Sequence, residues 1–245
     1  MGLESLTQLE LSLGLFTFIW TLISLLVGVR IFSKYFSQKQ KELLTVGLAW
    51  IFLSSAWWGS AFSFLSIIIS NQPLDTFSFL FLGNFFLPIA ICCWIYSFCN
   101  LGFPSIKKIL LPVYLVICVI FDIFLLVFLF TDPRIVGSVE GNFYSQPNLF
   151  ALVFQLFAAA TTIVTGLIFS IDSIKSDDSK VKLKGKFLLL AFVSFTIGAL
   201  FDAAIPLNIV SLVIVRLILI SSGIEYYLGF LMPDKLAKAL LKSKT

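Results

Sequence analysis

The sequence contains no histidine, and charged residues make up only 12% of its 245 residues. Histidine is a common metal ligand and proton carrier near neutral pH, so its absence excludes a Cys/His metal site and argues against acid–base catalysis. A soluble domain carries about 25% charged residues, because its surface faces water. The shortage of charge therefore indicates that lipid, rather than water, surrounds most of the chain.

Apolar residues are abundant in the chain. They make up 59% of the chain, and the mean hydropathy is +1.04. A helix needs about 20 predominantly apolar residues to cross the hydrocarbon core. We expect spans at residues 11–29, 44–70, 76–101, 109–131, 147–171, 187–205 and 208–232. The predicted fold is an all-α bundle of seven transmembrane helices over residues 1–232, with a tight turn at Pro206 and Asn208.

The basic residues are distributed very unevenly between the two predicted sides. Those on one side are Arg30, Lys34, Lys39, Lys41, Lys107, Lys108, Lys175, Lys180, Lys182, Lys184, Lys186, Lys235, Lys238, Lys242 and Lys244. Cytoplasmic loops carry the excess of lysine and arginine. We therefore expect a multi-pass plasma-membrane protein, with its N-terminus extracytoplasmic and its C-terminus cytoplasmic. The net charge of +4 is scattered between apolar runs, which argues against a nucleic-acid partner.

Residues 233–245 form a separate short tail. Asp234 is a suitable N-cap, and Leu236, Ala239 and Leu240 share one helical face among lysines. This pattern predicts an amphipathic cytoplasmic helix that lies on the inner leaflet. A docking surface and a simple membrane-flanking end both remain open as roles for it.

Four ionisable residues fall inside predicted spans: Asp122, Asp202, Arg216 and Glu225. Each costs about 2.5–3.5 kcal/mol on insertion scales, so such residues mark sites that need an explanation. The helical rise places Asp122 and Arg216 at similar depths, roughly 12–14 Å below the outer interface. Arg216 can pair with Asp122, with Asp202 or with both. The arrangement is either an outward-facing polar pocket for a ligand or ion, or an ion pair that holds helices together.

Further polar residues lie within the spans. Asn84 and Pro88 are one turn apart in the third span, where the proline predicts a kink, and Gln155 is a buried candidate in the fifth. We group both amides with Asp122, Asp202 and Arg216 as one candidate ligand-binding polar cluster within the membrane. Glu225 follows Arg216 by nine positions, which places it on the opposite face of the helix, on the side of Ser222 and near the cytoplasmic end. Glu225 is either a proton-sensitive residue or a residue that extends its carboxylate toward the inner interface, and we expect the second.

Small and hydroxyl-bearing residues recur at helical spacing in several spans. They include Thr17, Thr21, Ser24 and Gly28 in the first span, Ser55, Gly59 and Ser63 in the second, and Ala158, Thr162 and Gly166 in the fifth. Small residues let helix backbones approach closely where lipid provides no hydrophobic drive. We interpret these stripes as helix-packing surfaces.

Several seven-helix classes lack their required residues here. Retinal proteins need a lysine in the last helix, where this chain has only Arg216, whose guanidinium does not form a Schiff base near neutral pH. The acidic–arginine pair and the Asn-Pro-x-x-Tyr pattern of G-protein-coupled receptors are missing. Only Pro88 lies deep in a predicted span, which argues against transporters with repeated broken helices.

The end of the seventh span carries one resemblance. The segment Gly223-Ile-Glu-Tyr-Tyr-Leu-Gly-Phe-Leu-Met-Pro-Asp-Lys-Leu resembles the exit of seven-helix sensor regions at the start of some prokaryotic histidine kinases, and of stand-alone archaeal relatives. The tryptophan-rich second span and Trp94 in the third fit the same family. The resemblance implies a prokaryotic plasma membrane, and helices that feed a cytoplasmic kinase. Because the sequence continues only to Thr245, we expect a separate cytoplasmic signalling partner.

The sequence therefore predicts a non-enzymatic, sensor- or receptor-like membrane protein with no cofactor and no metal. The carboxylates lie at distant depths and form no recognisable acid–base pair. The alternatives are a small channel or transporter, working as a homo-oligomer, and a structural membrane protein whose polar residues only join helices.

Overall fold

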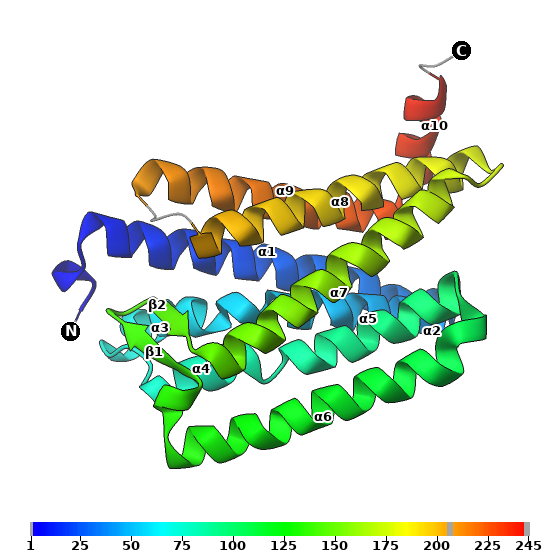
Figure 1. Ribbon diagram of the computed structural model, residues 1–245. Helices are drawn as coiled ribbons and strands as arrows, with labels where there is room; N and C mark the ends of the chain where they lie inside the picture. Colours follow the sequence, from blue (N-terminus) through cyan, green and yellow to red (C-terminus); the bar gives the residue numbers. More distant parts are fainter. Residues whose placement is uncertain (1, 205–207, 243–245) are drawn as a thin grey trace.

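The computed structural model describes residues 2–204 and 208–242, which form a helical bundle (Figure 1). Seven of the described segments are long and apolar enough to cross a membrane: Gln8–Gln38, Lys41–Ser70, Thr76–Leu101, Pro104–Thr131, Leu149–Ile174, Ser179–Ala203 and Ile209–Leu231. They match the seven predicted spans one for one. The chain is a multi-pass integral membrane protein of the all-α class.

The individual elements follow the chain in a simple up-and-down order. They are η1 Leu3–Ser5, α1 Gln8–Gln38, α2 Lys41–Leu53, η2 Ser54–Trp57, α3 Trp58–Ser70, α4 Thr76–Asn84, α5 Leu87–Leu101, η3 Pro104–Ile106, α6 Lys107–Thr131, η4 Pro133–Ile135, β1 Gly137–Glu140, β2 Tyr144–Pro147, α7 Leu149–Ile174, α8 Ser179–Ala204, α9 Ile209–Leu231 and α10 Asp234–Lys242. We call the end of the bundle that bears β1, β2 and the N-terminus the hairpin end, and the opposite end the lysine-rich end.

Most helices extend past the predicted spans, especially at the lysine-rich end. The first span was expected to end at residue 29, whereas α1 continues to Gln38. Lysine and glutamine are good helix formers, so a helix continues into the headgroup region after its apolar run stops. Asn208 caps α9 through its side chain. Residue 205, Pro206 in the predicted turn, and residues 243–245 of the tail, including Lys244, lie outside the described residues.

Two spans are interrupted near their middle. In the third span, α4 ends at Asn84 and α5 begins at Leu87 with Pro88 in its first turn, which confirms the predicted kink, because proline donates no backbone hydrogen bond and crowds the preceding turn. In the second span, the 3-10 segment η2 separates α2 from α3, which we did not predict. The Ser54 hydroxyl donates to the Ile51 carbonyl at 2.7 Å, a bond that competes with regular helix geometry.

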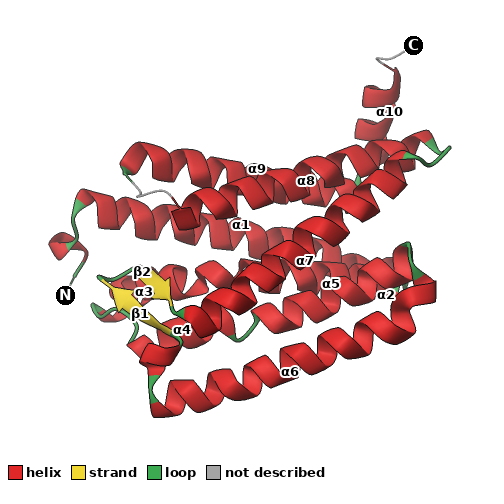
Figure 2. Ribbon diagram, viewed as in Figure 1, coloured by secondary structure: helices red, strands yellow, loops and turns green. Residues whose placement is uncertain are grey.

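The connection between α6 and α7 folds as a small antiparallel hairpin, shown in yellow in Figure 2. Its strands pair Gly137 with Pro147 and Glu140 with Tyr144, and Gly141 adopts a φ of +62° in the turn. Phe143 at the tip is 3% exposed and packs against Phe64 and Ile67 of α3. A loop expected to lie in water therefore covers part of the hairpin end.

The outer surface and the helix contacts both follow the sequence pattern. Large apolar side chains of α6 are about half exposed or more, among them Ile109, Val113, Val116, Ile120 and Phe130. The predicted small-residue stripes are buried, and a side chain on Gly28 would meet the Gly47 carbonyl at 2.9 Å. Lipid is therefore the natural solvent of α6, and α1 approaches α2 as closely as the stripe predicts.

Candidate functional site

A buried ion pair joins α8 to α9. Arg216 Nη1 lies 2.7 Å from Asp202 Oδ1, and the two side chains are 3% and 16% exposed. Asp202 lies near the end of α8, and Arg216 lies about two turns after the start of α9. Antiparallel helices joined by a short connection bring such residues to the same level. Of the pairings left open by the sequence, the structure forms the one with Asp202.

Two more residues complete the coordination of this pair. Trp57 Nε1 donates to Asp202 Oδ2 at 2.6 Å, and Arg216 Nε and Nη2 donate to Thr17 Oγ1 at 3.2 and 3.1 Å. We call Thr17, Trp57, Asp202 and Arg216 the charge cluster. Its members come from four segments that are distant in the sequence: α1, η2, α8 and α9.

The 3-10 geometry of η2 affects where Trp57 points. A 3-10 helix has three residues per turn, so each residue rotates about 20° more than in an α-helix. Over the four residues of η2, this difference turns the following side chains by roughly a quarter of a circle. Thr17 belongs to the stripe of the first span and Trp57 lies beside the stripe of the second, but no sequence signal indicated that they would contact charge.

The carboxylate of Asp202 and the guanidinium of Arg216 both find hydrogen-bond partners within the charge cluster. Both carboxylate oxygens of Asp202 accept a hydrogen bond, and three nitrogens of the guanidinium donate one. Burying an ion pair is costly unless the remaining lone pairs and protons find partners, and removing one partner costs about 3–5 kcal/mol. The cluster therefore holds α1, η2, α8 and α9 together.

The hairpin lies one turn above the charge cluster. Ser60, three residues after Trp57, donates to the Phe143 carbonyl, and Ser63 donates to the Asn142 carbonyl at 2.8 Å. Asn142 Nδ2 in turn donates to Glu10 Oε1 at 3.0 Å. The tip of the hairpin is thus hydrogen-bonded to α1 and α3, on the hairpin-end side of Trp57.

A layer of aromatic side chains lies next to the charge cluster, on the side toward the lysine-rich end. Trp20 is fully buried, and its ring centroid lies 5.7 Å from Trp57 and 6.3 Å from Trp50. Trp50 stacks on Tyr226 of α9 at 4.2 Å. The rings of this layer pack closely, but the indole Nε1 atoms of Trp20 and Trp50 are buried without a hydrogen-bond partner among the described residues.

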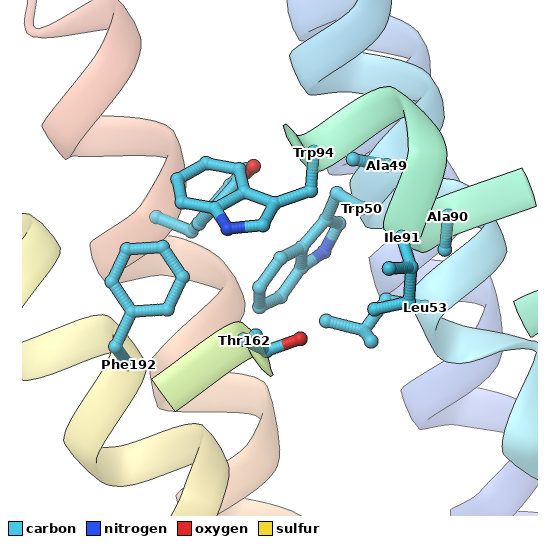
Figure 3. Close-up of a pocket in the computed structure, with 9 residues that line it drawn as sticks. Ala49, Trp50, Leu53, Ala90, Ile91, Trp94, Thr162 and Phe192 are labelled. Carbon is cyan, nitrogen blue, oxygen red and sulfur yellow. The ribbon is translucent and has the colours of Figure 1, made fainter. Parts of the chain in front are cut away.

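A small cavity adjoins this layer (Figure 3). Its volume is about 10 Å³, and its lining is Ala49, Trp50, Leu53, Ala90, Ile91, Trp94, Thr162, Phe192 and Tyr226. The polar groups of Trp94 and Thr162 already bond to Thr165 and to the Ala158 carbonyl. A space of this size holds one water molecule at most, so in this conformation it is no ligand pocket.

Asn84 and Gln155 form a second, separate contact. Gln155 Nε2 donates to Asn84 Oδ1 at 3.1 Å, and Asn84 Nδ2 donates to the Leu80 carbonyl at 2.9 Å. This pair links α4 to α7 beside the break at Pro88. The two amides were predicted to belong to one polar group with the ionisable residues, but they bond to each other instead.

Asp122 lies away from the charge cluster. It is half-buried on α6, which packs against α4 and α5 on the side of the bundle opposite α8 and α9 (Figure 1). Its Oδ1 is buried and has no hydrogen-bond partner among the described residues. The depth argument placed Asp122 level with Arg216, but depth along a helix does not give the position around the bundle.

Glu225 does not extend toward the inner interface as expected, and it does not bond to Ser222. Glu225 is 9% exposed, so it does not extend to the interface, and its Oε1 accepts from Ser221 at 2.6 Å. Its Oε2 has no partner among the described residues. Ser222 instead donates to the Leu219 carbonyl of its own helix. The expectation failed because α9 is covered on two sides, by α1 and by α8.

The lysine-rich end has its own polar contacts. Lys180 Nζ lies 2.5 Å from Asp234 Oδ1, which joins the start of α8 to α10, and Lys184 Nζ donates to the Phe230 carbonyl at 2.9 Å. The hydrogen bond and the charge of Lys180 lower the pKa of Asp234. These contacts tie α8, α9 and α10 together at the end remote from the charge cluster.

The comparisons with known proteins add no assignment. No protein-family model matches the chain, and no curated protein matches its sequence. In the part of the chain that the structure describes, no three His, Cys, Asp or Glu side chains are grouped to hold a metal ion. The protein is an integral membrane protein with seven apolar helices and a buried charge cluster near its hairpin end.

Proposed function

We propose that this protein is a non-enzymatic, sensor- or receptor-like membrane protein whose input site is the charge cluster. The observation that carries the proposal is that one ion pair holds four separate segments, three of which, α1, α8 and α9, continue to the opposite end of the bundle. A change at Asp202 or Arg216 therefore acts on α8 and α9 directly. The Gly223–Leu236 segment at the end of α9, with its resemblance to kinase sensor regions, supports the same assignment.

The charge cluster is suited to respond to a change in charge. Asp202 is 16% exposed while Arg216 is almost fully buried, so a small solute that reaches the pair meets the carboxylate first. Neutralising or displacing that carboxylate leaves the guanidinium with only Thr17 as a partner. A buried cation without a counter-charge is unfavourable, so this arrangement of α8 and α9 rises in free energy, and a shift of α9 relative to α8 becomes favourable.

The packing between α8 and α9 can transmit such a movement. Gly198 of α8 lies against Leu219, and Gly229 of α9 lies against Leu188, so the two helices interlock at two levels. Tightly packed helices shift as units rather than deform continuously. At the lysine-rich end this shift reaches α10 through the Lys180–Asp234 contact, where a cytoplasmic signalling protein would read it if that end faces the cytoplasm.

The test replaces Asp202 by Asn in the full-length protein in nanodiscs and measures hydrogen exchange. The variant keeps the shape of the side chain and removes its charge. We expect faster exchange at residues 176–186 and 234–242, with the remaining spans still protected. Asp122→Asn is the matched control, because it also neutralises a carboxylate within a span but lies outside the charge cluster, and it should leave those segments unchanged.

Two outcomes would replace the proposal. If Asp202→Asn lowers stability while exchange at the lysine-rich end stays the same, the cluster only joins helices, and the structural alternative holds. If liposomes containing the protein show an ion flux that Asp202→Asn abolishes, the protein is a channel or transporter. Both measurements use the same purified protein and variants.

A further inference from the structure

The short helix α10 leaves the bundle sideways. Figure 1 shows it turned across the axis of the long helices at the lysine-rich end. Pro233 separates it from α9, because proline interrupts the backbone hydrogen bonding of a continuing helix. A helix that follows a transmembrane segment and turns across its axis runs along the membrane surface instead of away from it.

The side chains of α10 divide into two groups. Ala237 is buried, and Leu236, Leu240 and Leu241 are partly buried. Lys235 and Lys238 are exposed. This division is that of an interfacial helix, with apolar residues on one side and cationic residues available to headgroups.

The direction of α10 is set by contacts with the bundle. Lys180 at the start of α8 pairs with Asp234, the first residue of α10, at 2.5 Å. Lys184 donates to the carbonyl of Phe230, one residue before the end of α9. The first turn of α10 is therefore held at the level where α8 and α9 leave the apolar zone.

The lysine-rich end as a whole carries an excess of positive charge. Its basic residues include Lys34, Lys39, Lys41, Lys107, Lys108, Lys175, Lys180, Lys182, Lys184, Lys186, Lys235 and Lys238, and its acidic residues include Glu42, Asp172, Asp177, Asp178 and Asp234. Negative surface charge attracts such segments over about a Debye length. The complementary surface that is always within reach of this end is the leaflet that surrounds the helices.

We propose that α10 binds anionic phospholipid headgroups of the surrounding leaflet through Lys235 and Lys238, and so anchors the end of α9 to the membrane surface. Each lysine near such a surface strengthens binding about five-fold, so the two together contribute about 30-fold. This role is independent of the input at the charge cluster and concerns only the lysine-rich end.

The test places a fluorophore on α10 in the full-length protein. Ala239→Cys, at an exposed position, is labelled with a water-soluble maleimide dye. The native cysteines, which are buried or half-buried, are controlled by carrying the unsubstituted protein through the same labelling. Nanodiscs contain brominated phosphatidylglycerol or brominated phosphatidylcholine at equal bromine content. We expect stronger quenching by the brominated anionic lipid, and a loss of that preference at high salt.

Charge variants make the outcome decisive. Lys235→Gln with Lys238→Gln should lower the preference for the anionic lipid about 30-fold, whereas arginine at both positions should keep it. Lys107→Gln with Lys108→Gln is the matched control, because it removes the same charge at the start of α6. Equal quenching by both lipids in the unsubstituted background would overturn the proposal. Absence of quenching by either lipid would also overturn it, and would leave α10 available to a protein partner.

Discussion

Replacement of Arg216 by Met should be among the most destabilising single changes in the chain. The variant leaves Asp202 buried with Trp57 as its remaining hydrogen-bond partner in the charge cluster, and it leaves the Thr17 hydroxyl without its donor. Removing one member of a buried ion pair costs about 3–5 kcal/mol. Loss of a single hydrogen bond to a charged group costs about 1.5–3 kcal/mol, so Trp57→Phe should cost less.

The double variant Arg216→Met with Asp202→Leu separates the ion pair from simple packing. Apolar side chains of similar volume in place of a buried ion pair are often neutral or stabilising. We therefore expect the double variant to be more stable than Arg216→Met alone. The free energy of unfolding would be measured by titration with sodium dodecyl sulfate in mixed micelles, followed by far-ultraviolet circular dichroism.

The comparison has a clear refuting outcome. If Arg216→Met costs less than about 1 kcal/mol, the guanidinium does not hold the four segments together, since that cost is typical of an exposed pair. If the double variant is less stable than either single variant, the residues contribute through packing and not through their charges. Asp122→Leu is a suitable control, because it removes an intramembrane carboxylate outside the charge cluster.

Three further outcomes follow from other parts of the structure. The pKa of Asp234 is lowered from its ordinary value of 3.8, so the Lys180 contact stabilises the fold fully above pH 3.8 and is lost as the pH falls through the lowered pKa. Hydrogen exchange in α10 should therefore become faster at low pH. Asp234→Asn should abolish this pH dependence. Gly28→Ala should destabilise by about 1–3 kcal/mol, because its Cβ would meet backbone and side chain of α2, whereas Gly83→Ala, with its nearest such atom at 4.0 Å, should be tolerated in thermal unfolding. Phe143→Ala should cost about 3–5 kcal/mol if the hairpin unfolds with the bundle, and otherwise show only as faster exchange in residues 137–147.

Features that depend only on the position of residues along the chain were predictable from the sequence. The run of apolar residues determines that a helix crosses the membrane, and the missing backbone donor of Pro88 determines that the third span breaks there. The 3-10 segment at Ser54–Trp57 was missed because serine and tryptophan are compatible with a regular helix. The Ser54 hydroxyl bond to the Ile51 carbonyl does not distinguish this segment, because Ser222 makes the same kind of bond within the regular helix α9.

For the candidate site, too, the sequence indicated some features and only the tertiary structure showed the others. The sequence indicated that Arg216 needed a carboxylate and that Asp202 was one of the candidates. It could not exclude Asp122, because spacing measures depth along a helix and gives no information on which helices are neighbours. The expected exposure of Glu225 failed for a related reason, since contact on a second side of α9 depends on where α8 packs.

By itself, the sequence determined that lipid is the solvent, that seven helices cross it, and that lysine gathers at one end. These properties depend on composition and on the helical rise, which are local along the chain. Only the tertiary structure decided that Thr17 and Trp57 complete the ion pair, that Asp122 stands apart, and that a hairpin covers part of one end. Those features depend on lateral contacts between segments far apart in the sequence, and such contacts arise from packing.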